Sequence, residues 1–156
     1  MKLNKLFPKA NSVDINSLMS DSRLVQDHSL FFCLKGMKHD GHQHIAQAVE
    51  NGAIAIVHSD EFATYLPFID YIKVENVHEE LNRCAALFYG QPSEKLKIFG
   101  VTGTNGKTTV AKIIKSIYTV HANTGYIGTI GLEYNQIQSK PDYTTPEVIA
   151  LHETLD

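Results

Sequence analysis

The stretch Gly100-Val101-Thr102-Gly103-Thr104-Asn105-Gly106-Lys107-Thr108-Thr109 decides how this chain is interpreted. It follows an apolar run at 96–99, which we predict to be a buried strand, and it precedes a segment with helical apolar period, 110–117. A glycine-rich turn between a strand and a helix, ending in Lys-Thr, is the arrangement that binds the phosphates of a nucleoside triphosphate. Backbone N–H groups of the turn and the N-terminus of the helix attract the phosphate oxygens.

The same pattern predicts a role for each residue of the loop. We expect Gly103 to Gly106 to wrap the phosphates, Lys107 to neutralise the β- and γ-phosphates as the catalytic cation, and Thr108 to reach Mg²⁺. The predicted nucleotide-binding residues are Gly103, Thr104, Asn105, Gly106, Lys107, Thr108 and Thr109. Val101 stands where the strict phosphate loop has its first glycine, which indicates a particular subfamily. The alternative is a glycine-rich turn that binds nothing.

The composition is that of a soluble globular protein, with 43% hydrophobic and 20% charged residues among 156. A net charge of −3 gives no basic surface, so no nucleic-acid partner is expected. Cys33 and Cys84 are isolated, which excludes a disulfide framework and fits a reducing compartment. The N-terminus lacks the apolar core of a signal peptide, and the longest apolar run, 53–57, is too short to span a bilayer. We therefore expect a cytoplasmic protein with no membrane partner.

Strands and helices alternate along the chain, which predicts an α/β fold. The first block has strands at 30–34, 53–57 and 71–74, a helix at 44–49, and a second helix capped by Asn76 and ended by Gly90. A polar linker, Gly90–Lys95, leads to the phosphate loop, a strand within 124–130 and a helix begun at Pro146. We predict a small N-terminal α/β domain at 1–90, followed at 91–156 by the truncated start of a P-loop ATP-binding α/β domain.

Several short motifs, in a fixed order, resemble those of the Mur ligases. Residues 102–109, read as TGTNGKTT, resemble the ATP loop of this family and are most similar to its MurE type. Four further segments resemble family motifs: Asp21-Ser22-Arg23, the pattern from Leu30-Phe31-Phe32 through Asp40-Gly41-His42 to Gly52-Ala53, Phe88-Tyr89-Gly90, and Thr144-Thr145-Pro146. The resemblance covers nearly the whole chain.

This resemblance implies an ATP-dependent acid–amino-acid ligase of peptidoglycan synthesis. Such an enzyme adds lysine or diaminopimelate to UDP-N-acetylmuramoyl-L-Ala-D-Glu through an acyl phosphate, with ATP and Mg²⁺ as cofactors, small molecules as its partners, and a monomer as the expected state. The family's acidic Mg²⁺ ligand, carbamylated lysine and C-terminal domain have no counterpart here, so we expect this chain to be an inactive N-terminal fragment. The alternatives are another Mur-type ligase, such as the MurF type, and a non-catalytic UDP-sugar- or nucleotide-binding module.

The resemblance also implies contacts with the UDP-sugar, by Ser22 in the first domain and by Thr144 and Thr145 in the second. Structural roles compete with both assignments. The turn at 21–23 could hold only a surface ion pair, and Thr145 is predicted to cap a helix that begins at Pro146.

Residues 38–42 lie where the family approaches the uracil nucleotide, although loop exposure alone would also explain them. The histidines at 39, 42 and 44 lack the spacing of a zinc site. We interpret His42 as part of the Asp40-Gly41-His42 turn.

Overall fold

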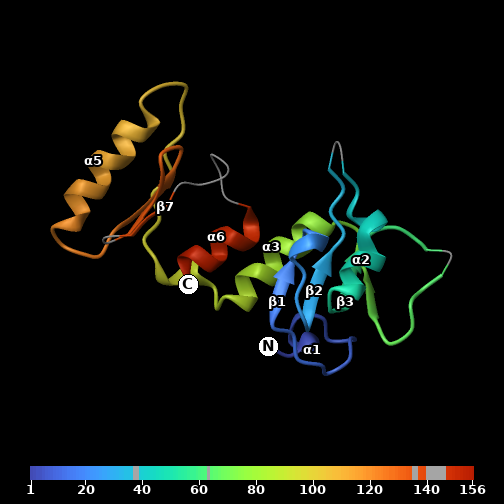
Figure 1. Ribbon diagram of the computed structural model, residues 1–156. Helices are drawn as coiled ribbons and strands as arrows, with labels where there is room; N and C mark the ends of the chain where they lie inside the picture. The colour runs from blue at the N-terminus through green and yellow to red at the C-terminus, as the bar shows by residue number, and fades with distance from the viewer. Residues whose placement is uncertain (37–38, 63, 135–136, 140–146) are drawn as a thin grey trace.

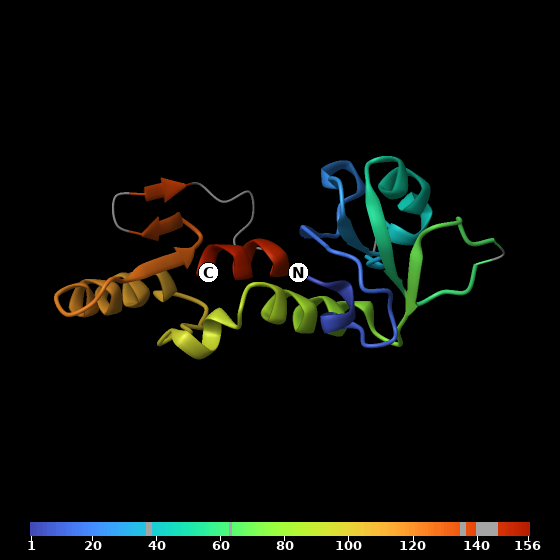
Figure 2. The ribbon, with the colours of Figure 1, turned by 90° about the horizontal axis from the view of Figure 1, so that it is seen from below.

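The computed structural model describes residues 1–36, 39–62, 64–134, 137–139 and 147–156, and of 137–139 it describes the backbone alone. Two sheets lie at opposite ends of an elongated molecule, with helices between them (Figures 1 and 2). One sheet is parallel and flanked by helices, which confirms the predicted α/β class. None of the described helices is long and apolar enough to cross a membrane.

The parallel sheet contains four strands in the order in which they occur along the chain. They are β1 (Ser17–Met19), β2 (Ser29–Phe32), β3 (Ala53–His58) and β4 (Asp70–Lys73). Two short 3-10 helices, η1 (Ser22–Leu24) and η2 (Gly41–His44), follow β1 and β2, and η2 continues into the helix α2 (Ile45–Glu50). Because all four strands point the same way, the segments that follow β1, β2 and β3 meet at one edge, the carboxyl edge.

Both faces of this sheet are covered, as the unbroken apolar run at 53–57 predicts. Leu30 and Phe32 pack on one face against α1 (Leu3–Leu6) and α3 (Val77–Phe88), whereas Phe31 packs on the other against α2. Alternation between the two faces follows from the two-residue period of a strand. The prediction for α3 is confirmed, since the Asn76 side chain accepts two N–H bonds in its first turn.

Among its described residues, the second half of the chain contains three helices and a three-stranded antiparallel sheet. These are α4 (Pro92–Lys95), α5 (Lys107–Thr119), β5 (Gly125–Gly128), β6 (Gly131–Tyr134), β7 (Ile137–Ser139) and α6 (Val148–Leu155). The predicted strand within 124–130 is present as β5. Glu133 on β6 pairs with Lys112 and Lys115 of α5, so two ion pairs hold this helix to the sheet.

The predicted buried strand at 96–99 is wrong. Residues 97–101 have no regular secondary structure, and Ile98 and Phe99 are 57% and 46% exposed. A strand needs a neighbour to bond its backbone, and none of the described strands lies alongside this segment. The apolar side chains of Val110, Ile113 and Ile117 on α5 are also exposed.

Two predicted boundaries also shift. Part of the expected linker, 92–95, forms the helical turn α4, whose Pro92 is buried. The last helix, α6, begins at Val148 with Glu147 as its N-cap, two residues later than the predicted start at Pro146.

Candidate functional site: a phosphate loop and the carboxyl edge of the parallel sheet

The glycine-rich loop turns sharply into the N-terminus of α5. Gly103 has φ +148° and Gly106 has φ +78°, backbone conformations that residues with a side chain rarely adopt. Gly106 is the N-cap of α5 and has no side chain, so the N-cap residue itself makes no side-chain bond to the N–H groups of the first turn. Free N–H groups and the positive end of the helix dipole are features that suit a turn to anions such as phosphate.

Lys107 is the first residue of α5 and bends back over the loop. Its Nζ donates to the Gly103 carbonyl oxygen at 2.6 Å, and the side chain is exposed. Thr108 lies half-buried in the same helical turn. An ammonium group held over the loop and a hydroxyl beside it fit the donor set expected for a triphosphate with Mg²⁺.

The turn at Asp21–Arg23 lies at the carboxyl end of β1. Asp21 caps η1 by accepting the Arg23 N–H at 3.0 Å, and the guanidinium of Arg23 binds the same carboxylate at 2.5 Å. The Arg23 hydrogen bonds lower the pKa of Asp21 to about 2. Ser22 is buried, and its hydroxyl donates to Gln47 Oε1 of α2 at 2.7 Å. The polar turn is therefore confirmed, and a UDP-sugar contact by Ser22 stays a prediction.

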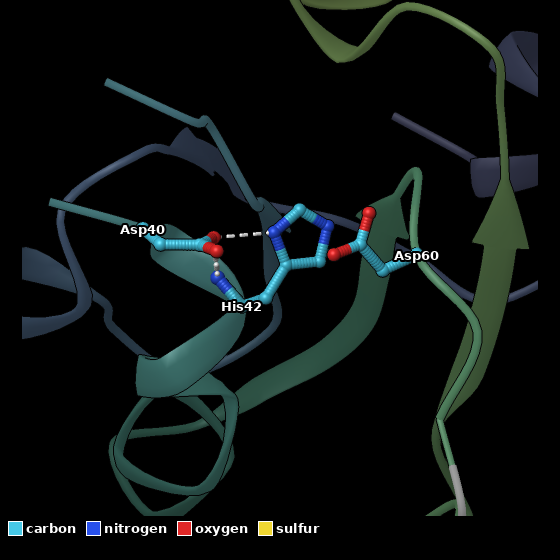
Figure 3. Close-up of side chains that lie close together, drawn as sticks. All are labelled: Asp40, His42 and Asp60. Atoms are coloured by element: carbon cyan, nitrogen blue, oxygen red, sulfur yellow. Dashed lines mark hydrogen bonds and ion pairs between the residues drawn. The ribbon is translucent and has the colours of Figure 1, made fainter. Parts of the chain in front are cut away.

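A cluster of polar groups joins the segments that follow β2 and β3 (Figure 3). Asp40 caps η2 by accepting the His42 N–H at 3.0 Å, which confirms the predicted Asp-Gly-His turn. The same Asp40 oxygen lies 2.6 Å from His42 Nδ1, and the Ser59 N–H donates to His42 Nε2 at 3.2 Å. Lys35 binds Asp60 at 2.7 Å and lowers the pKa of that carboxyl.

Asp40, His42 and Asp60 place possible metal-ligand atoms within 4.8 Å of one another. Both ring nitrogens of His42 already have hydrogen-bond partners, and Lys35 neutralises Asp60. These contacts favour a hydrogen-bonded network over a metal site at this position. Sequence reasoning missed Ser59 and Asp60, although their place shortly after the apolar run at 53–57 puts them at the carboxyl edge.

The structure does not bring all predicted site residues together. Gly103 to Thr109 run from the glycine-rich loop into the first turn of α5, whereas Ser22 begins η1, which follows β1. The parallel sheet that contains β1 lies at the other end of the molecule from α5 (Figure 1). Thr144 and Thr145 lie outside the described residues. Cys33 and Cys84 are free and buried, and burial raises the pKa of both thiols to about 12, so neither serves as a nucleophile.

Comparison with known families gives two matches along the chain. Residues 14–89 match the profile described as "Mur ligase family, catalytic domain", and residues 101–156 match "Mur ligase middle domain". Together the two matches cover both halves of the fold described above.

Two curated relatives are ligases with the same name. The UDP-N-acetylmuramoyl-L-alanyl-D-glutamate--2,6-diaminopimelate ligase of Clostridioides difficile (strain 630) is 39% identical over 90% of this chain and 29% of its own length. The ligase of the same name from Pseudomonas putida is 40% identical over 100% of this chain and 32% of its own length. The chain thus spans about three tenths of the length of these relatives.

Solved structures agree in fold. A structure of a UDP-N-acetylmuramoyl-L-alanyl-D-glutamate--2,6-diaminopimelate ligase has a TM-score of 0.76 and 22% identity, over 99% of this chain and 32% of that one. The MurF ligase from Thermotoga maritima in complex with ADP has a TM-score of 0.53 and 26% identity, over 69% of this chain and 24% of that one.

Proposed function

This chain belongs to the Mur ligase family, and we propose that it carries the UDP-sugar-binding and ATP-binding residues of an ATP-dependent ligase of peptidoglycan synthesis. The proposed reaction adds an amino acid to UDP-N-acetylmuramoyl-L-Ala-D-Glu. Diaminopimelate, which the relatives' names contain, is the first amine to test, and lysine is the second. The observation that carries this proposal is the loop 103–109, whose glycine conformations and helix N-terminus suit phosphate oxygens.

The proposed chemistry forms an amide through an acyl phosphate. The terminal carboxylate of the UDP-sugar peptide attacks the γ-phosphate of ATP, and ADP leaves. The amine then attacks the acyl carbon, and inorganic phosphate leaves. Two anions must meet in the first step, so cationic groups beside the γ-phosphate lower its barrier.

Residues of this chain have distinct tasks in that proposal. N–H groups at 103–106 and in the first turn of α5 bind and orient the phosphates, and Lys107 moves from the Gly103 carbonyl to the phosphate oxygens. Mg²⁺, when bound, supplies charge neutralisation between the β- and γ-phosphates, and the Thr108 hydroxyl would hold it.

A single substitution tests the assignment of Lys107. In the ligase that contains these residues, Lys107→Ala should lower turnover by about 100-fold or more, because a cation aimed at transferring charge is worth several kcal/mol. Lys95→Ala, which removes an exposed lysine from α4, is the matched control and should change little. Turnover of the Lys107 variant close to that of the control would refute the assignment.

The chain of 156 residues by itself is expected to show no turnover. Phosphoryl transfer depends on positioning, and the segment before the loop has no strand beside it among the described residues. Phosphate release with UDP-N-acetylmuramoyl-L-Ala-D-Glu, ATP, Mg²⁺ and either amine measures this. Release at a rate near that of the whole relatives would show that the expectation is wrong.

A further inference from the structure

The imidazole of His42 has one defined hydrogen-bonding state. The backbone N–H of Ser59 can only donate, so His42 Nε2, 3.2 Å away, must be the nitrogen without a proton. The ring proton therefore lies on Nδ1, where it faces Asp40 Oδ1 at 2.6 Å. Asp40 thus selects the tautomer of His42 that can accept a bond from Ser59.

This arrangement joins two loops that are distant in sequence. His42 belongs to η2, which follows β2, whereas Ser59 directly follows β3. The His42 side chain is only 6% exposed, so water competes weakly for its bonds. The pair Lys35–Asp60 crosses between the same two segments at 2.7 Å, so the contact is one part of a network.

The location of this network indicates what it does. In sheets of parallel strands, ligands bind outside the carboxyl ends of the strands, and all groups named here lie at that edge. Ser22, the residue predicted to contact the UDP-sugar, follows β1 at the same edge. No hydrogen bond between Ser22 and His42 is present among the described residues.

We propose that His42 is a positioning residue for the nucleotide sugar: oriented by Asp40, it locks the segment after β3 to the turn after β2 and so sets the shape of the binding edge. The inference rests on the proposed function, because it takes the UDP-sugar as the ligand of this edge. His42 acts here through Ser59 and Asp40 and touches no reacting atom.

Two substitutions of His42, by glutamine and by asparagine, distinguish the bond made by Nε2 from the bond made by Nδ1. The amide of His42→Gln reaches the place of Nε2 and can accept from Ser59, whereas that of His42→Asn ends at the place of Nδ1 and keeps only Asp40. His44→Gln is the matched control, because His44 is an exposed histidine of the same turn. The chain of 156 residues is titrated calorimetrically with UDP-N-acetylmuramoyl-L-Ala-D-Glu, and hydrogen exchange of the Ser59 amide is followed by NMR.

The three variants are expected to give different results. His42→Asn should weaken binding of the nucleotide sugar about tenfold, the value of one lost buried hydrogen bond, and should abolish protection of the Ser59 amide. His42→Gln should keep the affinity for the nucleotide sugar and the protection of the Ser59 amide within about twofold of wild type. His44→Gln should change neither quantity. If His42→Asn does not fold, Asp40→Asn retains the cap of η2 and should weaken binding by a smaller factor, about threefold.

Two failures are distinguishable. A wild-type chain that does not bind the nucleotide sugar overturns the proposed function and this inference with it. A wild-type chain that binds, with His42→Asn or Asp40→Asn binding as tightly as it does, overturns the positioning role alone. Equal losses in His42→Gln and His42→Asn overturn it too, because a merely structural ring would not be rescued by one amide and not the other.

Discussion

Polar residues at the carboxyl end of β1 each make more than one hydrogen bond within the protein. Asp21 caps η1 and also binds the guanidinium of Arg23. Ser22 bonds to Gln47 through its side chain and to Asn51 through its carbonyl. These residues therefore need variants that separate a structural bond from a ligand contact.

Ser22 offers such a test. In the whole ligase, Ser22→Ala should raise the KM for the UDP-sugar several-fold with little change in kcat, because a contact remote from the chemistry contributes equally to ground and transition states. Gln47→Ala removes the same internal hydrogen bond and leaves the serine hydroxyl in place. It should leave KM unchanged, and steady-state kinetics of both variants decide the question. A fall in kcat for Ser22→Ala at constant KM would place Ser22 elsewhere.

The ionisation of Asp21 makes the free energy of unfolding depend on pH. Its pKa is lowered from 3.8 to about 2 in the folded chain, so its contribution to stability is complete above pH 4 and is lost as pH falls through about 2. Asp21→Asn keeps the cap of η1 and removes the charge. We expect it to lower the free energy of unfolding by at most about 1 kcal/mol at pH 7, since the pair is partly solvated.

Urea unfolding of wild type and Asp21→Asn at several pH values checks this prediction. The difference in free energy of unfolding between wild type and Asp21→Asn should become smaller as pH is lowered from 4 towards 2. A difference that stays constant over this range would show that the ion pair does not cause it.

Among the elements, α3 contributes most to one face of the core. Val77, Leu81, Cys84 and Ala85 are buried on it, at the spacing of one helical face. Its first turn is capped by Asn76, and Gly90, with φ +69°, follows its end. α6, from the far end of the chain, packs on the same helix through Val148 and Ile149.

A matched pair of leucines measures that packing. Leu81 is 4% exposed and Leu87 is 36% exposed, and both belong to α3. Leu81→Ala should lower the free energy of unfolding by about 2–4 kcal/mol, because it removes buried apolar surface and leaves a cavity. Leu87→Ala should cost less than about 1 kcal/mol, since much of its surface is already in water. Urea titrations give both values, and equal losses would contradict the assignment of the core face.

At the scale of the whole molecule, two sheets of different kinds are joined by an exposed segment. Residues 97–101 have no regular structure, whereas the turn α4 before them holds a buried proline. We expect limited trypsin digestion to cut first after Lys97 and to release a compact N-terminal fragment. Mass spectrometry of the early products checks this, with Lys97→Gln as the control. Early cleavage within 30–57 would contradict the proposed domain boundary.

Local features of the sequence determined the elements whose causes are local. The glycines at 103 and 106 predict a turn, Asn76 predicts a helix start, and the apolar run at 53–57 predicts a buried strand. All three are present, and both glycines have positive φ. Each depends on backbone sterics, on a bond to a residue two or three positions away, or on burial of one short run. The glycine-rich turn before α5 is therefore recognisable without a structure.

Tertiary structure alone decided the features that depend on distant partners. The run at 96–99 is as apolar as many buried strands, yet it forms no strand, because none of the described strands lies alongside it to bond its backbone. The contact of His42 with Ser59 spans 17 residues and exists because two parallel strands end at one edge. α6 also packs against α3, a contact between helices that are distant in sequence. Which surface covers an apolar helix face depends on the whole fold, so the local sequence pattern does not predict it.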